Sequence, residues 1–274
     1  MKRLLGVMGD PIAHSVSPAI HTAAIEALGL DYEYLPFRVT PERVGDAVRG
    51  MRALDIRGMN VTVPHKERVI EFLDKLTPRS EATGSVNTII NDNGVLIGDT
   101  TDGEGFLRDF EMIFGPVRGK RALLLGAGGA ARSVAYSLAA AGCGITIVNR
   151  TSEKAESIKS MLRRSFDDIF VEIGYNISDS VNNSDFVINT TSVGMIHPEE
   201  TPLEGSYLRK DLGVYDIIYN PPRTRLMREA ESVGAATANG LGMLVNQAAL
   251  SFVSWTGKRP PLELMFEAAS IALF

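Results

Sequence analysis

The amino-acid sequence predicts an α/β fold with two domains. The chain has 274 residues, which is enough for one large domain or two of ordinary size. From the start, short runs rich in leucine and β-branched residues alternate with segments of helical periodicity, a pattern typical of βαβ units and a mostly parallel sheet. A second series of the same kind begins at Arg121. Each series can therefore form a sheet of its own.

In the first series, strands and helices alternate regularly. Strands are predicted at Leu4–Met8, Tyr32–Val39 and Gly58–Val63, and helices at Ala19–Leu28, Glu42–Met51 and Glu67–Leu73. A further run, Ser85–Ile90, has strand-like character. The helical segment Phe106–Phe114 stops at Gly115-Pro116, because glycine and proline after a periodic segment end a helix.

The second series supplies the strands and helices of the other domain. Strands are predicted at Leu123–Leu125 and Ile145–Val148 and near 169–173, 185–189 and 214–219, and helices at 130–141 and 152–163. The last stretch, Gly242–Phe274, is again helical, and we expect it to return to the first domain. The predicted division is residues 1–102, completed by 240–274, for one domain and residues 103–239 for the other.

Composition and charge exclude several classes of protein. Hydrophobic residues make up 45% and charged residues 22%, as in an ordinary globular chain. The 28 basic and 33 acidic residues give a net charge of −5, so there is no excess of positive charge to hold a nucleic acid. Cys143 is the only cysteine. We therefore expect neither a disulfide framework nor a metal site built from several thiolates, and no metal.

Targeting features of the sequence favour the cytoplasm. The apolar stretch after Lys2 and Arg3 is interrupted by Gly6 and Pro11, which makes it too short for the apolar region of a signal peptide. The longest apolar run, around 122–131, is roughly half as long as a membrane span needs. A reducing cytoplasm fits the cysteine content best, and no membrane partner is expected.

A glycine-rich turn marks the start of the second series. Residues 121–131 read RALLLGAGGAA, a buried strand followed by Gly126-x-Gly128-x-x-Ala131 and an alanine-rich helix. Gly126 permits a tight turn, Gly128 lets the backbone approach a ligand, and the small Ala131 lets the helix pack on the strand. A helix amino terminus at this point can receive a pyrophosphate group, although a glycine turn alone can also be a simple strand-to-helix connection. The strand before it and the helix after it favour a doubly wound, Rossmann-type dinucleotide-binding domain.

The residues after the next strand favour NADP(H) as the cofactor. Asn149-Arg150-Thr151 stands about where NAD-binding sheets carry an acid, ~20 residues after the first glycine, and no carboxylate is present there. Arg150 offers a planar guanidinium group to a ribose 2′-phosphate. The alternatives are that Arg150 is a solvated loop residue and that Thr151 or Ser152 caps the next helix. Lys154 is a weaker candidate for the phosphate.

Three polar segments of the first domain lie in loops beside strand ends, where α/β sheets bind ligands. They are Ser15–Pro18 (SVSP), Asn60–Lys66 (NVTVPHK), and Ser85–Thr88 (SVNT) together with Gly98–Gly103 (GDTTDG). Because the second domain is predicted to hold a nicotinamide cofactor, we expect the first domain to hold the substrate.

With these segments in place, the sequence closely resembles the shikimate dehydrogenase family. The SxSP turn, NVTVPHK, SVNT, TDG, GAGGAAR, NRT, NTTSVGM, DIIYNPPRT and NGLGMLVNQA occur in the family's order and spacing and cover essentially the whole chain. The resemblance implies reduction of 3-dehydroshikimate to shikimate with NADPH in aromatic amino-acid biosynthesis. The sequence departs from the family at Thr100, where the family usually has Asn, so hydrogen bonding around Asp102 is expected to differ.

The resemblance also implies roles for individual residues. Lys66 and Asp102 would form the catalytic pair. The substrate carboxylate would meet Ser15, Ser17 and Tyr219, and its hydroxyls and reacting end would meet Thr62, Asn87 and Gln247. The cofactor would meet Gly126, Ala127, Gly128, Gly129, Ala130, Asn149, Arg150, Thr151, Lys154, Thr190, Ser192, Ile217 and Gly240. Hydroxyls, amides and a phenol are the groups that a small polyhydroxylated acid requires.

Several of these residues also have an ordinary structural interpretation. Ser17 before Pro18 makes a good helix N-cap, so structure and function have equal weight there. Asn87 lies in a strand-like run where asparagine is depleted, which favours function. Tyr219 is predicted to close the strand Val214–Ile218, where buried tyrosines are more often core residues, and only the resemblance favours substrate binding.

Lys66 is the most informative single residue. It falls just after Pro64 and is predicted in the first turn of a helix, where the macrodipole disfavours a cation. If it is held over a substrate carbonyl, the dipole would ease proton release and Asp102 could orient the ammonium group. Among the histidines, His65 is the nearest alternative for acid–base chemistry and is expected to be structural, and His21 is predicted on a helix surface.

Other functions stay open on the sequence. A quinate/shikimate dehydrogenase has similar motifs but often uses NAD and a substrate with one more hydroxyl group; Arg150 and the two serines favour the narrower enzyme. A non-catalytic, ligand-sensing relative would be expected to lack Lys66 or Asp102, and both are present. The sequence does not distinguish a monomer from a homodimer.

Overall fold

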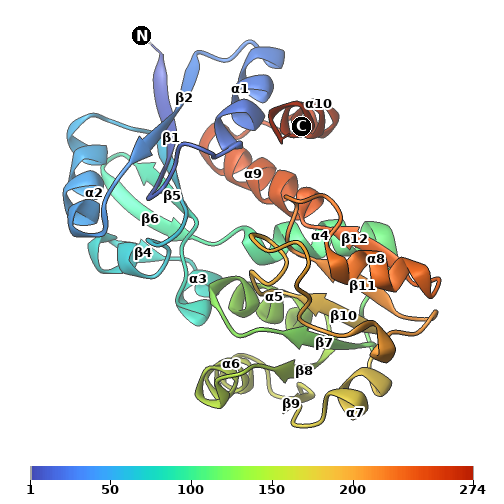
Figure 1. The fold of residues 1–274 in the computed structure, drawn as a ribbon. Helices are drawn as coiled ribbons and strands as arrows, with labels where there is room; N and C mark the ends of the chain where they lie inside the picture. The colour runs from blue at the N-terminus through green and yellow to red at the C-terminus, as the bar shows by residue number, and fades with distance from the viewer. Residues whose placement is uncertain (1, 274) are drawn as a thin grey trace. The chain divides into compact units, whose positions relative to one another are not determined.

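The structure, a computed structural model, describes residues 2–273 and divides into two compact units. One unit consists of Met1–Gly105 with Val245–Phe274, and the other of Phe106–Leu244. Each contains a six-stranded sheet accompanied by helices (Figure 1). The predicted α/β class is confirmed. The sequence places the domain junctions at 102 and 239, whereas the compact units change at 105 and 244.

The unit Phe106–Leu244 has the strand order of a doubly wound nucleotide-binding sheet. Its strands all run parallel, in the order β12-β11-β10-β7-β8-β9. Their bounds are β7 Arg121–Leu125, β8 Gly144–Val148, β9 Val171–Ile173, β10 Phe186–Asn189, β11 Gly213–Asp216 and β12 Ala236–Asn239. The chain order reverses between β7 and β10, and ligands of such sheets bind outside the carboxyl ends of the strands at the reversal. The predicted Rossmann-type topology is confirmed.

Both faces of this sheet are buried. Ala122 and Leu124 of β7 belong to one apolar cluster, and Leu123 and Leu125 to another, because successive side chains of a strand point to opposite faces. The helices of this part of the chain are α4 Asp102–Phe114, α5 Gly129–Ala140, α6 Ser152–Ser165, α7 Ile177–Asn182 and α8 Arg225–Ser232, with a 3-10 helix at Gly205–Tyr207. The strands of this sheet were therefore predicted from continuous apolar runs. Parallel strands that are buried on both faces show no alternation of apolar and polar residues.

Two carboxylates are buried in the same unit. The Tyr215 hydroxyl donates to Asp109 Oδ2 at 2.8 Å, and the Thr224 hydroxyl donates to Asp216 Oδ2 at 2.7 Å. Burial raises the pKa of both carboxyl groups, against the hydrogen bonds that lower it. Both groups therefore bind a proton more tightly in the folded chain than when exposed to water.

The sheet of the other unit is mixed. Its order is β2-β1-β3-β5-β6-β4, with β1 Arg3–Gly9, β2 Tyr32–Arg38, β3 Gly58–Val61, β4 Lys75–Leu76, β5 Thr88–Asp92 and β6 Val95–Asp99. Strand β1 pairs in parallel with β2 and β3, and β4 pairs in parallel with β6. Strand β5 is antiparallel to both β3 and β6. The predicted mostly parallel sheet thus has an antiparallel element that the sequence analysis did not include.

A tight turn explains this element. Asn93 and Gly94 connect β5 with β6 and have φ values of +51° and +90°. Two successive residues at positive φ are typical of the two-residue hairpin turn for which Asn-Gly is the preferred sequence. The pair was visible in the sequence as a hairpin signal between two short strands.

The helices of this unit are α1 Ser17–Ala27, α2 Val44–Ala53, α3 Pro78–Thr83, α9 Leu241–Thr256 and α10 Leu262–Leu273, with 3-10 helices η1 Pro41–Arg43 and η2 Arg68–Phe72. Helix α10 packs against α1, so the carboxyl-terminal helices return to the first unit as predicted. The predicted helix at Glu67–Leu73 is wrong in type, because only a short 3-10 helix forms there.

His21 corrects another prediction. It lies on α1 and is fully buried, not on the helix surface. Its ring stacks on Tyr34 with the ring centroids 4.2 Å apart, and Trp255 lies at 5.4 Å. Burial lowers the pKa of His21 from 6.5 to about 3. The imidazole is therefore neutral at ordinary pH.

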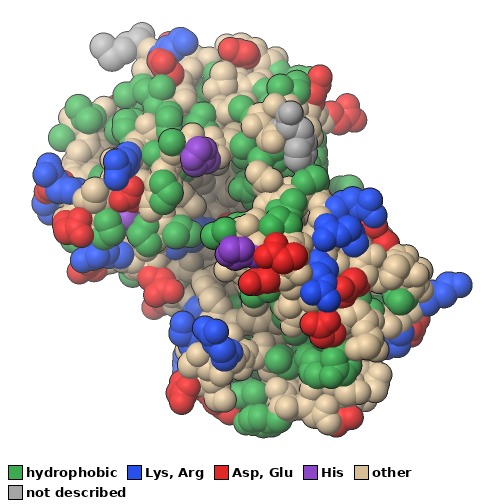
Figure 2. All heavy atoms as spheres, viewed as in Figure 1, with side chains coloured by type: hydrophobic (Ala, Val, Ile, Leu, Met, Phe, Trp, Pro, Cys, Tyr) green, Lys and Arg blue, Asp and Glu red, His purple; other side chains and the backbone are tan. Residues whose placement is uncertain are grey.

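The surface carries charges of both signs. On the face drawn in Figure 2, Lys and Arg side chains alternate with Asp and Glu side chains. Within residues 2–273, no helix is both long and apolar enough to cross a membrane. In the same described range, no group of three or more His, Cys, Asp or Glu side chains is placed to hold a metal ion.

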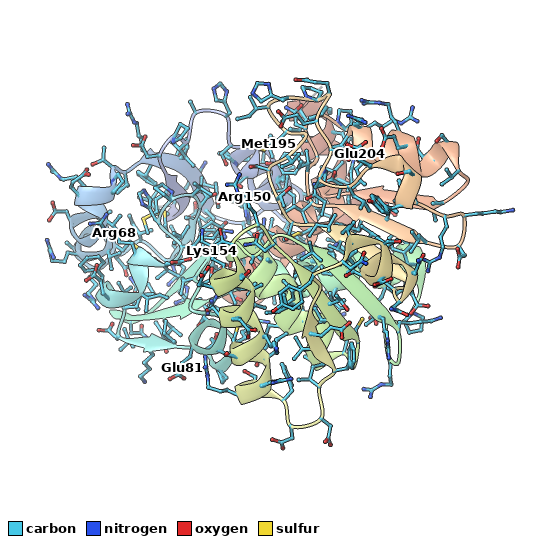
Figure 3. All side chains as sticks on the ribbon, turned by 60° about the horizontal axis from the view of Figure 1, so that its bottom comes forward. Arg68, Glu81, Arg150, Lys154, Met195 and Glu204 are labelled. Atoms are coloured by element: carbon cyan, nitrogen blue, oxygen red, sulfur yellow. The ribbon has the colours of Figure 1, made fainter. Side chains whose placement is uncertain are left out.

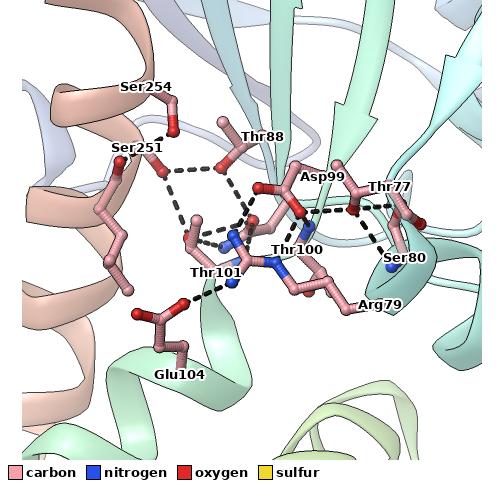
Figure 4. Close-up of polar contacts among 12 residues, drawn as sticks. Thr77, Arg79, Ser80, Thr88, Asp99, Thr100, Thr101, Glu104, Ser251 and Ser254 are labelled. Carbon is pink, nitrogen blue, oxygen red and sulfur yellow. Dashed lines mark hydrogen bonds and ion pairs between the residues drawn. The ribbon is translucent and has the colours of Figure 1, made fainter. Parts of the chain in front are cut away.

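An ion pair supports the segment that precedes the TDG motif. Arg79 donates through Nε and Nη2 to the two carboxylate oxygens of Asp99, at 2.7 and 2.6 Å, and it also binds Glu104 (Figure 4). The Asp99 side chain is 6% exposed. Burial alone would raise the pKa of Asp99, but the Arg79 and Thr77 hydrogen bonds lower it below its ordinary value.

Arg79→Met is therefore expected to destabilise the protein by about 3 kcal/mol at pH 7, because it leaves a buried carboxylate without its cation. The pKa of Asp99 is lowered by folding, so this stabilisation is present above the ordinary carboxyl pKa and is lost as the pH falls through the folded value. Urea unfolding at pH 7 and in acid measures it. Arg49→Met removes an exposed ion pair and should cost less than about 1 kcal/mol; equal losses for both variants would contradict the argument.

Candidate active site

Lys66 and Asp102 form an ion pair in the first unit. Lys66 Nζ donates to Asp102 Oδ2 at 2.6 Å. The Asp102 side chain is 9% exposed and the Lys66 side chain 28% exposed, so the carboxylate is shielded while the lysine side chain remains partly exposed. Asp102 is also the first residue of α4, where the helix dipole favours a negative charge. The structure thus brings together the two residues predicted as the catalytic pair.

The turn before Lys66 is anchored by His65. This histidine is fully buried, and its Nε2 atom lies 2.6 Å from the Val39 carbonyl oxygen. Because a carbonyl only accepts, Nε2 carries the proton, and the ring supports the turn as expected for a structural histidine. Lys66 precedes the 3-10 helix η2, so the predicted position in the first turn of an α-helix is wrong and the macrodipole does not act on it.

Asn87 connects this pair with α9. It is buried and lies one residue before β5, so its predicted position inside the strand is wrong. The Thr101 backbone N–H donates to Asn87 Oδ1 at 2.9 Å, which fixes the orientation of the amide. Asn87 Nδ2 then donates to Asp102 Oδ1 at 2.8 Å and to Gln247 Oε1 at 3.1 Å.

Thr101 belongs to the same group, and the sequence analysis missed it. Its buried hydroxyl accepts from Asn87 Nδ2 at 2.9 Å and donates to the Gln247 carbonyl oxygen at 3.0 Å. A second threonine beside Asp102 in the TTDG segment was the available signal.

Thr62 lies just after β3, half-buried, with its backbone N–H bonded to Met8 O.

Ser15 and Ser17 lie at the start of α1. The helix begins at Ser17, with Val16 in the N-cap position and no capping hydrogen bond from a side chain, so the N-cap interpretation of Ser17 is wrong. Instead, Ser15 Oγ accepts from the Ser17 backbone N–H at 3.4 Å. Both serines are half-buried.

The glycine turn after β7 has the open backbone that a phosphate loop needs. Gly126 has a φ of +105°, and a Cβ atom added there would lie 2.9 Å from Thr190 Oγ1. At Gly128 and Gly129, an added Cβ would have no described atom within 4 Å, so the space that a side chain would fill is open. Gly128 is the N-cap of α5 without a side-chain cap. The first N–H groups of α5 can therefore bind a pyrophosphate, and the loop fits the predicted cofactor.

Thr190 supports this loop from the next strand. It follows β10, and its hydroxyl and backbone N–H both donate to Leu125 O, at 2.7 and 2.9 Å. These bonds tie the carboxyl ends of β10 and β7 together at the reversal of the sheet. Ala127 is buried in the turn, and Ala130 is half-buried in the first turn of α5.

Three further predicted cofactor residues lie after β10, β11 and β12. A Cβ atom added at Gly240 would lie 2.0 Å from Ile217 O, so the two segments pack backbone to backbone and Gly240 admits no side chain. Ser192 is exposed. All three follow the carboxyl ends of their strands, the edge at which doubly wound sheets bind ligands.

Asn149, Arg150 and Thr151 connect β8 with α6. Asn149 Nδ2 donates to Thr151 O at 2.8 Å. Thr151 is the N-cap of α6 without a side-chain cap hydrogen bond, so its predicted capping role is not formed. Arg150 and Lys154 are both exposed at the start of this helix (Figure 3).

Tyr219 lies in the nucleotide-binding unit. Strand β11 ends at Asp216, so the predicted strand Val214–Ile218 is too long and Tyr219 lies in the following loop. Burial raises the pKa of Tyr219, and its hydroxyl is therefore a neutral donor at ordinary pH.

A doubly wound nucleotide-binding sheet and a paired ammonium and carboxylate define a dinucleotide-dependent oxidoreductase. Three family descriptions match: the shikimate dehydrogenase substrate binding domain at residues 7–89, shikimate/quinate 5-dehydrogenase at 109–214, and the shikimate 5′-dehydrogenase C-terminal domain at 240–269. The shikimate dehydrogenase (NADP+) of Methanopyrus kandleri is 45% identical over an alignment of 273 positions that covers 97% of this chain and 94% of that one. The chain belongs to the shikimate dehydrogenase family.

Solved structures show the same fold. A shikimate dehydrogenase in complex with NADP+ matches with a TM-score of 0.93 and 38% identity, over 100% of this chain and 96% of that one. The shikimate 5-dehydrogenase of Listeria monocytogenes, in complex with shikimate and NAD, matches with a TM-score of 0.92 and 38% identity, over 97% and 96%.

Proposed function

We propose that the protein catalyses the reversible reduction of 3-dehydroshikimate to shikimate with NADPH, a step of aromatic amino-acid biosynthesis. The observation that carries the proposal is the Lys66–Asp102 ion pair, held by Asn87 beside Gln247, in a chain of this family. An ion pair of this kind, with a partly exposed lysine side chain, can deliver a proton to a substrate oxygen.

The cofactor, when bound, supplies a hydride for the carbonyl carbon of the substrate. Lys66 meets the negative charge that develops on the carbonyl oxygen and gives it a proton. Asp102 holds the ammonium group in place, and Asn87 holds the carboxylate through its N–H. In the oxidation direction the proton returns to Lys66 by the same path.

Neutral groups hold the substrate in this proposal. Ser15, Ser17 and Tyr219 bind its carboxylate, and Thr62, Asn87 and Gln247 bind its hydroxyls and its reacting end. The half-buried positions of the two serines support their role, as does the neutral state of the tyrosine. A carboxylate bound by hydroxyl groups alone keeps its charge without a buried cation.

The cofactor residues divide by the group that they meet. Gly126, Ala127, Gly128, Gly129 and Ala130 hold the pyrophosphate, with Thr190 supporting the loop. Asn149, Arg150, Thr151 and Lys154 hold the adenosine ribose and its 2′-phosphate. Ser192, Ile217 and Gly240 border the rest of the cofactor at the strand ends. The open space at Gly128 and Gly129 is what supports this arrangement.

Nicotinamide absorbance tests the function. Shikimate with NADP+ should produce NADPH, and quinate with NAD+ should react far more slowly. Efficient turnover of the second mixture would favour the quinate/shikimate enzyme, and no turnover of either would favour the ligand-sensing relative.

We place the enzyme in the cytoplasm, where the buried Cys143, whose pKa burial raises to about 12, has no redox role. Sedimentation distinguishes a monomer from a homodimer.

Arg150→Ala is expected to weaken NADPH binding by about 1–3 kcal/mol, the scale of a lost charge-assisted hydrogen bond, while NADH binding changes little. The reason is that the glycine loop meets groups that both cofactors share, whereas Arg150 meets only the 2′-phosphate. Cofactor titration by fluorescence measures both constants. Arg164→Ala is the control, because Arg164 is an exposed arginine near the end of α6. Equal losses for both cofactors would contradict the assignment.

A further inference from the structure

Beyond Asn87, four buried polar side chains form a continuous hydrogen-bonded chain in the first unit. They are Tyr34 of β2, Asn60 of β3, Ser251 of α9 and Thr88 of β5. The proposed function assigns no role to any of them. Buried polar groups cost free energy unless they are paired, so a chain of four in one core requires an explanation.

The Asn60 amide fixes the direction of the first bonds. Its Nδ2 atom donates to Ser251 Oγ and to the Asn87 carbonyl oxygen, both at 3.1 Å. Because Nδ2 only donates, the amide oxygen faces the other way, and it accepts from the Tyr34 hydroxyl at 2.7 Å. The orientation of this amide is therefore set by three partners.

The two hydroxyls continue in the same direction. Thr88 donates its proton to Asn87 Oδ1 at 2.9 Å. The contact between the Thr88 and Ser251 hydroxyls, 2.7 Å (Figure 4), must then be donated by Ser251. The Gln247 carbonyl oxygen offers Ser251 a second acceptor at the longer distance of 3.1 Å.

The chain ends on the reactive carboxylate. Asn87 Nδ2 donates to Asp102 Oδ1, and Lys66 donates to Oδ2 of the same residue. Donors therefore run in order from Tyr34 through Asn60, Ser251, Thr88 and Asn87 to Asp102. Hydrogen bonds that all point the same way polarise one another in a medium of low dielectric constant.

We propose that Thr88 and Ser251 are positioning residues for the Lys66–Asp102 pair, whose hydroxyls hold the Asn87 amide with its N–H directed at the Asp102 carboxylate. This inference rests on the proposed function of that pair. The chain orients and does not conduct protons, because an amide N–H cannot pass its proton along and replace it from the carbonyl side under ordinary conditions. The hydroxyls act on the rate only through Asn87.

Two substitutions of Thr88 separate positioning from packing. Thr88→Val keeps the shape of the side chain and removes the hydroxyl, whereas Thr88→Ser keeps the hydroxyl and removes a buried methyl. If Thr88 positions Asn87, Thr88→Val should lower kcat for shikimate oxidation by about tenfold, the effect of ~1.4 kcal/mol, and Thr88→Ser should retain most of the activity. If Thr88 only packs, Thr88→Ser should be the worse variant, because serine loses buried apolar contact and strand propensity.

The KM for NADP+ should stay unchanged in both variants, because the glycine loop belongs to the other unit. Thermal unfolding is measured alongside. Ser251→Ala should also lower kcat several-fold, while Ser254→Ala should not. Ser254 is the matched control, since its hydroxyl likewise bonds a carbonyl four residues earlier on α9 but lies outside the chain. If Thr88→Val does not fold, the comparison of Ser251→Ala with Ser254→Ala tests the proposal.

NMR gives a readout that does not depend on turnover. The side-chain amide signals of Asn87, assigned with an Asn87→Ser variant, should shift in Thr88→Val and Ser251→Ala and remain in place in Ser254→Ala. If the wild-type protein is inactive but the variants show these shifts, the proposed function is contradicted and the positioning of Asn87 is supported. Active wild-type protein in which Thr88→Val matches or exceeds Thr88→Ser, with unshifted Asn87 signals, would overturn the inference alone.

Discussion

Lys66→Ala is expected to lower kcat by at least ~10²-fold, the scale of general acid–base catalysis, with only a modest change in the KM for 3-dehydroshikimate. The ammonium group gains little from a neutral carbonyl before the reaction and much from the charged oxygen of the transition state. Steady-state kinetics in both directions measures the effect. Because the substitution leaves the shielded Asp102 carboxylate without its partner, circular dichroism and thermal unfolding must accompany the assay.

Lys75→Ala is the control for Lys66→Ala, because Lys75 is an exposed lysine of β4 in the same unit. It should retain wild-type kinetics. A folded Lys66→Ala enzyme with near wild-type kcat would remove Lys66 from the mechanism and return His65 to consideration, although the proton on His65 Nε2 is already bonded to Val39 O.

Asp102→Asn is expected to show the second-largest loss, at least ~10-fold in kcat. The amide keeps the size of the side chain and its place at the start of α4 but cannot balance the charge of Lys66. Lys66 and Asn87 each donate to a different oxygen of the carboxylate. An amide has a single oxygen, so the two donors would have to share it. Retained activity with unchanged folding would show that the carboxylate is not needed.

The double variant, Lys66→Ala with Asp102→Asn, should be little slower than Lys66→Ala alone. Groups that act as a unit give strongly non-additive losses, because removing the second adds little once the first is gone. The measurement is the kcat of the four proteins of the cycle. Multiplicative losses would mean that Asp102 acts on the substrate independently of Lys66.

The nucleotide-binding unit was predictable because its signals are local. The run RALLLGAGGAA contains a buried strand, its turn and the start of its helix within eleven consecutive positions, and each residue acts where it stands. Strand β12 was missed for the opposite reason. Three of the four residues of Ala236–Asn239 are alanine or asparagine, which are depleted in strands, and the strand exists because β11 offers a parallel partner.

The candidate site was only partly predictable, because its geometry depends on contacts between distant segments. Motifs identified Lys66, Asp102 and Asn87, and the structure joins them. No local pattern connects Thr88 with Ser251, which are 163 positions apart, or buries His21 beneath Trp255. The 3-10 helix after Lys66 was missed because five residues are too few for helical periodicity to distinguish it from an α-helix.

The buried His21 makes unfolding of the first unit take up a proton in mild acid. Burial lowers the pKa of this imidazole from 6.5 to about 3, so between those values the unfolded chain binds a proton that the folded chain refuses. Each unit by which the pH falls through that interval lowers the free energy of unfolding by about 1.4 kcal/mol. Asp109 and Asp216 of the nucleotide-binding unit have raised pKa values and act with the opposite sign, because their protonation favours the folded form. Acidification is thus expected to unfold the first unit, with its Lys66–Asp102 pair, before the nucleotide-binding sheet unfolds.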